Sequence, residues 1–471
     1  MRVRAAFLAM VLGAVTPAAA AADEVVRGEP FPRPAALEPQ VRFWRSIFTE
    51  YSANQVVVHD ALRLDKIYRV LDLRDELESG MSQSEVDNLR RVDTDLALDE
   101  LRTRFLRLHS LAPSPDALAG EDRRLFELLA DDPAPDRFLA AAGEKRLRSQ
   151  RGLRERFAEA IRVSRRYLPE MERIFREEGV PVELTRLPLI ESCFNLHAYS
   201  KAGAAGIWQF MPATGRRFLR VDNLVDERRD PITATRAAAQ FLGHLHDALG
   251  AWPLAITAYN HGPEGIARAV EETGSTDIAT IVRDYRGAAF GFASRNFYAE
   301  FLAALDIDGD YQKYFGELPL ERPLRGREHR LERSVGIETA ARLAHTDREE
   351  LATLNPALSA MVVGGRRPIP AGYRLRLPES GATAFASRLA DVPAEPRVVR
   401  AAARSVVHKG KTAPVRTAFV THRVRRGQTL SHIAKQHRVS VARLMSANRL
   451  RKASTLKPGQ TIKIPVAANA A

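Results

Sequence analysis

Apolar residues recur every three or four positions from residue 152 onward, which is the period of an amphipathic helix. The first such stripe stops at Gly179, ahead of Pro181, a common way for a helix to end. Its members are Leu153, Phe157, Ile161, Leu168 and Phe175. Asp230-Pro231 has the form of another helix start, and that helix is expected to run to Gly250. Together with shorter periodic segments over 183–192, 253–259, 263–272 and 294–305, this pattern predicts a helical domain over residues 151–310.

Residues 37–150 show the helical period less clearly. Leu62, Ile67, Tyr68 and Leu71 form one set with this spacing. We therefore predict a helical N-terminal extension, and we find in it no cluster of side chains that indicates chemistry.

Two segments near the C-terminus resemble each other, 334–378 and 422–465. Each has two short apolar helical segments, the second ending at Asn355 or Asn448, and then a glycine followed by an alternating run that ends in proline. Such alternation is typical of a strand with one buried face. We predict small strand–helix–helix–strand (βααβ) modules over 332–380 and 421–466, joined by a basic linker over 381–420. The core of the second module is expected to contain Leu430, Ile433, Leu444 and Ile462.

The first residues have the composition of a secretory signal. Arg2 and Arg4 precede a short apolar stretch, and an alanine-rich segment follows Pro17. We expect residues 1–22 to be removed on export to the periplasm; a transmembrane anchor is the alternative, but the stretch is short for a bilayer. No other apolar run approaches that length, so we expect no integral membrane segment in the mature chain. The single cysteine, Cys193, is not placed to carry a lipid anchor.

Charge divides the chain into two parts. Residues after Glu395 contain 17 Lys and Arg and no Asp or Glu, and because the whole chain carries +13, residues 1–395 carry a net −4. A basic tail of this kind attracts anionic polymers or surfaces. Nucleic acid is the common partner of such tails, but export argues against it, so we expect no nucleic acid and predict anionic polymers of the cell envelope.

One glutamate stands out as a candidate acid. Glu191 ends a short predicted helix beside Leu187 and Ile190, and apolar surroundings raise the pKa of a carboxyl group. A general acid that protonates a glycosidic oxygen must hold its proton near neutral pH. Trp208 and Phe210 would offer flat apolar surface for a sugar. A glutamate near a helix end is more often a solvated surface residue, so composition and spacing leave both interpretations open.

A long run of motifs favours the catalytic interpretation. Leu187-Pro-Leu-Ile-Glu-Ser-Cys-Phe194 and Gly206-Ile-Trp-Gln-Phe-Met-Pro212 resemble the catalytic motif of lytic transglycosylases with a goose-lysozyme-like fold. Segments 226–231 and 255–262 match that family in order and spacing, and the resemblance covers about residues 150–305. Residues 422–465 resemble a LysM carbohydrate-binding module, and 334–378 a degenerate one.

The resemblance implies a mainly α chain with a lysozyme-like catalytic domain, a helical N-terminal extension and one or two small α+β LysM-like modules. It also implies cleavage of the β-1,4 bond between N-acetylmuramic acid and N-acetylglucosamine in peptidoglycan glycan strands, leaving a 1,6-anhydromuramic acid end. Glu191 would be the sole acid/base, first protonating the glycosidic oxygen and then deprotonating the C6 hydroxyl. Unlike the usual glycosidase pair, this reaction needs no second carboxylate. No metal and no cofactor are expected.

Further site residues follow from the same resemblance. The saccharide groove would be lined by Ser200, Gln209, Met211, Tyr259 and Asn260, although Ser200 could instead only brace its loop. The family's Glu-Thr-x-x-Tyr-Val sequence aligns with residues 293–298, where Ala293 and Phe297 replace the glutamate and tyrosine. Tyr298 or Asn296 is the expected substitute contact. The predicted glycan groove of the LysM-like module contains Gly427, Gln428, Thr429, Leu430, Lys457, Pro458 and Gly459.

Two alternatives remain open. A muramidase would let water, and not the C6 hydroxyl, complete the reaction. A wall-binding scaffold would keep the fold without turning over substrate.

Overall fold

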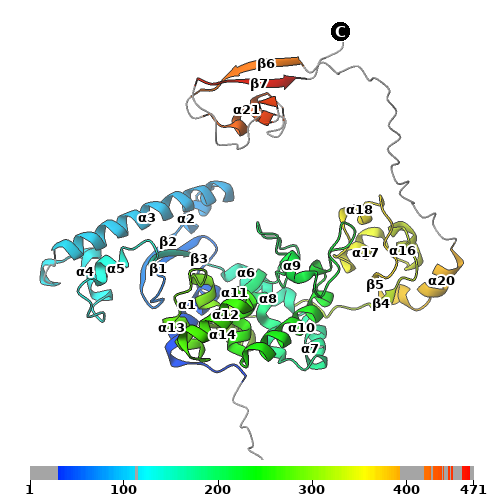
Figure 1. The fold of residues 1–471 in the computed structure, drawn as a ribbon, viewed down its shortest axis with the longest axis horizontal. Coiled ribbons are helices and arrows are strands. Elements are labelled where there is room, and N and C mark those ends of the chain that lie inside the picture. The colour runs from blue at the N-terminus through cyan, green and yellow to red at the C-terminus, as the bar shows by residue number, and fades with distance from the viewer. Residues whose placement is uncertain are drawn as a thin grey trace, which may run out of the picture. The chain divides into compact units, whose positions relative to one another are not determined.

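The computed structural model describes residues 30–111, 115–392, 418–425, 428–437, 439, 444–445, 447–448 and 459–466. The chain divides into two compact units, Met1–Glu395 and Pro396–Ala471. Helices dominate the first unit, which confirms the mainly α prediction (Figure 1). The predicted signal sequence and most of the predicted linker lie outside the described residues. Within the described parts, no helix is both long and apolar enough to cross a membrane.

The N-terminal extension contains a sheet where only helices were predicted. Strand β1 (Gln55–Asp60) lies between β2 (Ile67–Asp72) and β3 (Leu147–Arg151), and both pairings are antiparallel. Of the four apolar positions chosen as helical, Ile67, Tyr68 and Leu71 lie in β2 and Leu62 lies in the turn before it, because a short run of mixed apolar residues fits either period. β1 is buried on both faces and therefore lacks the alternation that marks a strand. The all-helical prediction is wrong for these segments.

Helices cover this sheet. The long helix α3 (Gln83–Leu111, cyan in Figure 1) packs on the strands with the short helices α2 (Arg74–Glu78), α4 (Gly120–Leu128) and α5 (Arg137–Ala141). Their shared core includes Tyr68, Phe105 and Phe138, all buried.

A second, larger core holds the predicted catalytic domain together. It includes α1 (Glu38–Thr49) from the extension, whose Phe48 ring stacks on Phe157 with the ring centroids 4.5 Å apart. The long helix α14 (Phe292–Gly309) lies inside this core and contacts α1, α8 and α11. The other helices are α6 (Arg154–Ser164), α7 (Leu168–Glu177), α8 (Leu187–Ser192), α9 (Pro212–Gly215), α10 (Pro231–Leu249), α11 (Trp252–His261), α12 (Pro263–Thr273), α13 (Ile278–Asp284) and α15 (Tyr311–Phe315).

The predicted start and stop of α10 are confirmed. The Asp230 carboxylate accepts hydrogen bonds from the backbone N–H groups of Ile232 and Thr233, which satisfies two donors of the first turn. Gly250 ends the helix in the left-handed region, at φ 75°.

The first βααβ module follows the catalytic domain. Strands β4 (Arg327–Arg330) and β5 (Arg374–Leu377) pair antiparallel, with α16 (Ile337–Leu343), α17 (Arg348–Leu354) and α18 (Ala360–Val363) between them. After β5 come α19 (Glu379–Ala382), which crosses the predicted end of the module at residue 380, and α20 (Phe385–Asp391), which lies where linker was predicted. Phe385 and Leu389 are buried in the core of this module, so residues 381–391 belong to it and not to a linker.

The second unit repeats the arrangement in part. Strands β6 (Ala418–Arg423) and β7 (Thr461–Val466) pair antiparallel, and α21 (Leu430–Gln436) lies between them in sequence. The four residues predicted as its core are all buried.

An asparagine plays the same part in both modules. Asn355 donates to the carbonyls of Leu351 and Arg376 and accepts from the Arg376 N–H. Asn448 makes the equivalent three bonds with Leu444 and Lys463. Each asparagine thus joins the end of the second helical segment to the last strand, which supports the repeat read from the sequence.

Candidate active site

Glu191 lies in the last turn of the short helix α8. Leu187, Pro188 and Leu189 are buried and anchor the first turn of this helix. Cys193 ends it in the left-handed region, at φ 48°, where few residues other than glycine settle. Backbone strain of this kind often marks a functional turn. The helix is therefore held in place by its apolar face, and it presents Glu191 beside a strained bend.

The surroundings of Glu191 favour its neutral form. Its side chain is half-buried, and no described residue forms a hydrogen bond or an ion pair with the carboxyl group. Burial raises the pKa of Glu191 to about 8. The carboxyl group consequently holds its proton at neutral pH, as a general acid must.

A tight loop follows α8 and is braced from within. The Ser200 hydroxyl accepts a hydrogen bond from the Ala204 N–H at 2.9 Å, so the bracing role considered for Ser200 is present. Gly206 has φ +74°, and a Cβ there would lie 1.8 Å from the carbonyl oxygen of Arg228. Only glycine fits at this position.

The Arg228 side chain holds the loop after α8 in place, a role that was not predicted from the sequence. This side chain is 4% exposed, and its guanidinium donates to the carbonyls of Gly203 and Phe210 while pairing with Asp226 at 2.8 Å. The 226–231 motif thus positions the loop that carries the predicted saccharide contacts. The match of this motif to the family was the available signal, but it did not indicate a role.

Gln209 and Met211 lie on the exposed side of this loop. Gln209 has φ 48°, and its amide nitrogen donates to the Gly206 carbonyl at 2.8 Å. Met211 is 42% exposed, which is unusual for so apolar a side chain. Trp208 and Phe210, in contrast, are core residues and not a sugar surface: the Trp208 indole is fully buried and donates to Thr235.

Tyr259 and Asn260 sit at the end of α11. The Tyr259 hydroxyl donates to the Trp208 carbonyl at 2.8 Å, and burial followed by the charge of nearby Glu191 raises the pKa of Tyr259. Asn260 is exposed, and its side-chain oxygen accepts a hydrogen bond from Ser294 at 3.0 Å. The structure therefore brings Glu191, Gln209 and Tyr259 to one place, with Asn260 at its edge.

Helix α14 supplies one correction and one addition. Tyr298 is 1% exposed and its hydroxyl donates to the Pro32 carbonyl, so it has no surface to offer a substrate, and the prediction that it is a contact is wrong. Glu300, on the same helix, is a second carboxyl group near Glu191. Burial and then the charge of Glu191 raise the pKa of Glu300 to about 8. Sequence reasoning missed Glu300 because only the tertiary fold brings α14 against α8.

The predicted groove of the second module is described only in part. Gly427, Lys457 and Pro458 lie outside the described residues. Leu430 is 1% exposed and belongs to the core, while Thr429 is exposed. The Gln428 side-chain oxygen accepts from the Arg425 N–H at 2.8 Å, so it braces its own turn. Gly459 turns the chain into β7 with φ +87°.

In the described part of the chain, no group of three or more His, Cys, Asp and Glu side chains is arranged to hold a metal ion.

Comparisons with known proteins identify two domains. Residues 172–282 match the family described as the Transglycosylase SLT domain, and residues 422–465 match the LysM domain. Both lie inside the regions predicted for them.

Two relatives are similar to parts of this chain. Membrane-bound lytic murein transglycosylase D of Escherichia coli (strain K12) is 31% identical over 299 residues, which cover 63% of this chain and 62% of that protein. The chain thus spans a little under two thirds of this relative. A putative tributyltin chloride resistance protein of Alteromonas sp. (strain M-1) is 42% identical over 96 residues, covering 20% of this chain and 46% of that protein.

Two solved structures of lytic transglycosylases show partial similarity to this chain. The 70 kDa soluble lytic transglycosylase of Escherichia coli has 21% identity and a TM-score of 0.26, covering 32% of this chain and 25% of that chain. An inactive variant of lytic transglycosylase Slt from Pseudomonas aeruginosa has 22% identity and a TM-score of 0.27, covering 43% and 32%. The resemblance found in the sequence is confirmed: this chain carries a transglycosylase SLT domain and a LysM domain, and it is similar to membrane-bound lytic murein transglycosylase D.

Proposed function

We propose that this protein is a peptidoglycan lytic transglycosylase, which cleaves the β-1,4 bond between N-acetylmuramic acid and N-acetylglucosamine during cell wall remodelling. The observation that carries the proposal is the state of Glu191, which lies inside the matched SLT domain. Its carboxyl group has no partner among the described residues, and burial raises its pKa to about 8.

The reaction needs one group that gives and then takes a proton. Neutral Glu191 donates its proton to the glycosidic oxygen as the bond to C1 of the muramic acid breaks. The carboxylate that results has a high proton affinity, because burial disfavours its charge. It therefore removes the proton of the C6 hydroxyl as that oxygen bonds to C1, which closes the 1,6-anhydro ring and restores the neutral acid.

Glu300 does not turn this site into a two-carboxylate glycosidase. A retaining glycosidase needs an ionised carboxylate as its nucleophile. With a pKa of about 8, Glu300 is largely protonated at neutral pH. Burial and then the charge of Glu191 raise the pKa of Glu300, so Glu300 stays neutral beside the acid.

Substrate contacts surround this acid. We assign hydrogen bonding with the saccharide to Gln209, Tyr259 and Asn260, and apolar packing to the exposed Met211. The Ser200 hydroxyl, which accepts from the loop backbone, retains its own proton to donate.

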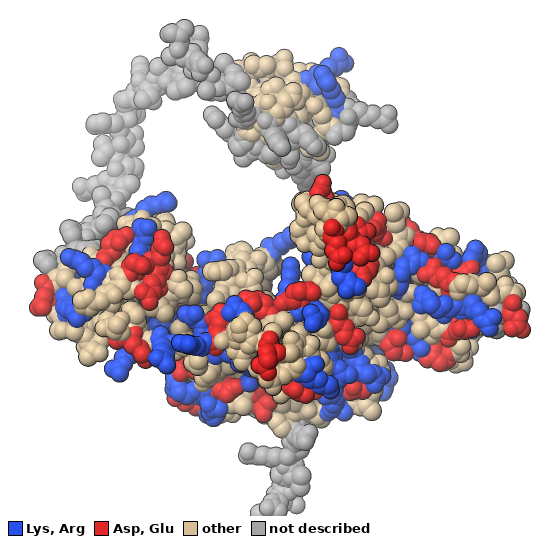
Figure 2. Space-filling model, turned by 180° about the vertical axis from the view of Figure 1, so that it is seen from behind, with Lys and Arg blue, Asp and Glu red and all other residues tan. Residues whose placement is uncertain are grey.

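Wall association belongs to the second unit in this proposal. The LysM module would bind glycan, and the basic tail would bind anionic envelope polymers. Together they would hold the enzyme at the cell wall after its signal sequence has directed it to the periplasm. Acidic and basic side chains are interspersed over the visible face of the first unit, in contrast to the tail (Figure 2).

Product mass tests the proposal. The full chain is incubated with purified sacculi, and the soluble fragments are analysed by mass spectrometry. We expect fragments lighter by one water than hydrolytic products, and their loss with Glu191→Gln but not with Glu264→Gln, a change at an exposed glutamate of α12. Reducing muramic acid ends would identify a hydrolytic muramidase. Equally slow solubilisation by the wild type and Glu191→Gln would identify a scaffold.

A further inference from the structure

A cavity of about 880 Å³ lies between the N-terminal extension and the end of the catalytic domain. Its walls come from α1, from the segment that leads into β3, and from the segment that joins α13 to α14. Among the residues that the sequence analysis considered as saccharide contacts, only Asn296, the alternative to Tyr298, lines it. The sequence indicated no chemistry in the N-terminal extension, yet the extension contributes part of the wall of this cavity.

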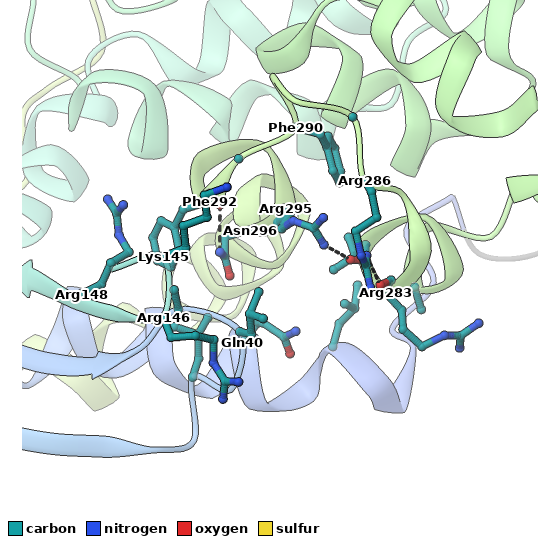
Figure 3. A pocket seen from close by; sticks show the side chains of 18 of the residues that line it. Gln40, Lys145, Arg146, Arg148, Arg283, Arg286, Phe290, Phe292, Arg295 and Asn296 are labelled. Atoms are coloured by element: carbon teal, nitrogen blue, oxygen red, sulfur yellow. Dashed lines mark hydrogen bonds between the residues drawn. The ribbon is translucent and has the colours of Figure 1, made fainter. Parts of the chain in front are cut away.

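The cavity is strongly basic. Six of its lining residues are Lys or Arg and only Glu144 is acidic. Figure 3 shows Lys145, Arg146 and Arg148 on one side and Arg283, Arg286 and Arg295 on the other. Two of the six already have partners just outside the cavity, because Arg146 pairs with Asp60 and Arg283 with Asp284.

The other four cations have no carboxylate partner among the described residues. Lys145, Arg148 and Arg286 are exposed at the rim. The Arg148 guanidinium rests 4.3 Å from the centre of the Phe292 ring, and Arg295 donates to the carbonyls of Val282 and Tyr285. Most arginines of the extension, in contrast, have acidic partners, as Arg69 has Glu100 and Glu121. Uncompensated cations that converge on one cavity indicate an anionic ligand.

Two side-chain oxygens in the same cavity accept no hydrogen bond from any residue that the structure describes. Asn296 is 2% exposed, its nitrogen donates to the Phe292 carbonyl at 2.9 Å, and its oxygen has no partner. The buried side-chain oxygen of Gln40, on α1, also has none. In Figure 3 the Asn296 amide extends from α14 toward Gln40. Buried acceptors without partners are costly, so a ligand with N–H groups would satisfy both.

The cavity also adjoins the proposed saccharide groove. Phe290, which lines the cavity, packs edge-on against the His261 ring, and the ring centroids are 5.2 Å apart. His261 directly follows Asn260, which lies at the edge of the groove. A group that branches from a glycan strand in the groove could therefore reach the cavity.

We propose that this cavity binds the acidic peptide that branches from the muramic acid of the strand. Such a peptide combines free carboxylates for the cations with amide N–H groups for Asn296 and Gln40. Its alkyl parts would pack on Leu37, Leu64 and Phe290, which line the same space. Inorganic phosphate matches only the charge, and a bare sugar matches only the hydrogen bonding. The assignment rests on the proposed function, since it takes peptidoglycan as the substrate.

Titration calorimetry with a free peptide tests the site without requiring catalysis. The full chain is titrated with L-alanyl-γ-D-glutamyl-meso-diaminopimelate. We expect binding at one site, and a loss of affinity of at least about tenfold in Lys145→Gln/Arg148→Gln, since each change removes a charge-assisted contact. Arg286→Gln and Asn296→Leu should each weaken binding through a separate wall of the cavity.

A matched control removes the same charges elsewhere. Lys313→Gln/Arg217→Gln changes an exposed lysine and an exposed arginine, each near an aromatic ring and without an ion pair among the described residues. This double variant should leave the affinity unchanged. The inference is overturned if the peptide does not bind, if both double variants bind it equally, or if inorganic phosphate displaces it at equal concentration. If the wild-type chain still releases anhydro products from sacculi in any of these cases, the peptide-binding proposal is wrong but the proposed function is supported.

Discussion

The neutral state of Glu191 has a consequence for folding stability that can be measured without substrate. When glutamine replaces Glu191, the side chain keeps its shape and hydrogen-bonding capacity but cannot ionise. In the unfolded chain Glu191 ionises near its ordinary pKa of 4.5, whereas in the folded chain the pKa is about 8. Between these values the unfolded state releases a proton that the folded state retains.

The sign and size of the effect follow from this difference. Because the folded pKa is raised, stability is fully present below pH 4.5 and is lost as the pH rises toward 8. Each pH unit in that window costs about 1.4 kcal/mol, so at pH 7, about 2.5 units above the ordinary pKa of 4.5, the wild type has lost at most roughly 3 to 4 kcal/mol. Contact of part of the side chain with water makes this an upper bound. Glu191→Gln should therefore be more stable than the wild type at pH 7, and the difference should vanish near pH 4.5.

Denaturant unfolding of the full chain at several pH values measures this difference. Glu264→Gln serves as the control, because it removes an exposed glutamate, and it should show no widening with pH. Glu300 shares the raised pKa, so Glu300→Gln should add a second stabilising increment over the same pH window. A gap between wild type and Glu191→Gln that stays constant from pH 4.5 to 8 would refute the reasoning.

Three further predictions concern the loop, the modules and the tail. Gly206→Ala should lower the rate of wall solubilisation at least about tenfold, because the added Cβ would meet the Arg228 carbonyl. Gly274→Ala, at a similar φ but in open space, should leave the rate unchanged. Equal rates for the two variants would contradict the bracing of the loop by Arg228. Asn355→Ala should cost about 3 kcal/mol of unfolding free energy, because it leaves buried backbone groups of β5 unpaired. Asn88→Ala, at an exposed asparagine, should cost little. Equal costs would contradict the role of Asn355 in joining the second helical segment to the last strand. Deleting the residues after Glu395 should weaken retention on sacculi more at low salt than at high salt; a loss indifferent to salt would assign retention to the glycan groove alone.

Local patterns predicted the helical domain and both modules well. The capped start of α10 and the glycine at its end are signals within one segment, and so are the glycine and alternating strand that close each module. The core residues of the second module were found for the same reason. Glu191 itself was found only by resemblance, because its spacing alone fits an ordinary surface glutamate.

Features that depend on tertiary contacts could not be predicted in this way. β1 is buried on both faces, and its partners β2 and β3 are far apart in sequence, so no periodicity marked the sheet. Trp208 was assigned to the surface although Phe175 and Thr235 bury it from two other helices. Glu300 and the basic cavity likewise exist only because α14 packs against α8 and lies beside the extension.

Direct titration of the Glu191 carboxyl group tests the central claim most closely. Infrared difference spectra between the wild type and Glu191→Gln isolate the carbonyl band of a protonated carboxylic acid, which disappears on ionisation. We expect the band to persist at neutral pH and to be lost around pH 8. Loss of the band near pH 4.5 would contradict the account, since a carboxylate ionised at neutral pH has no proton to give to the glycosidic oxygen.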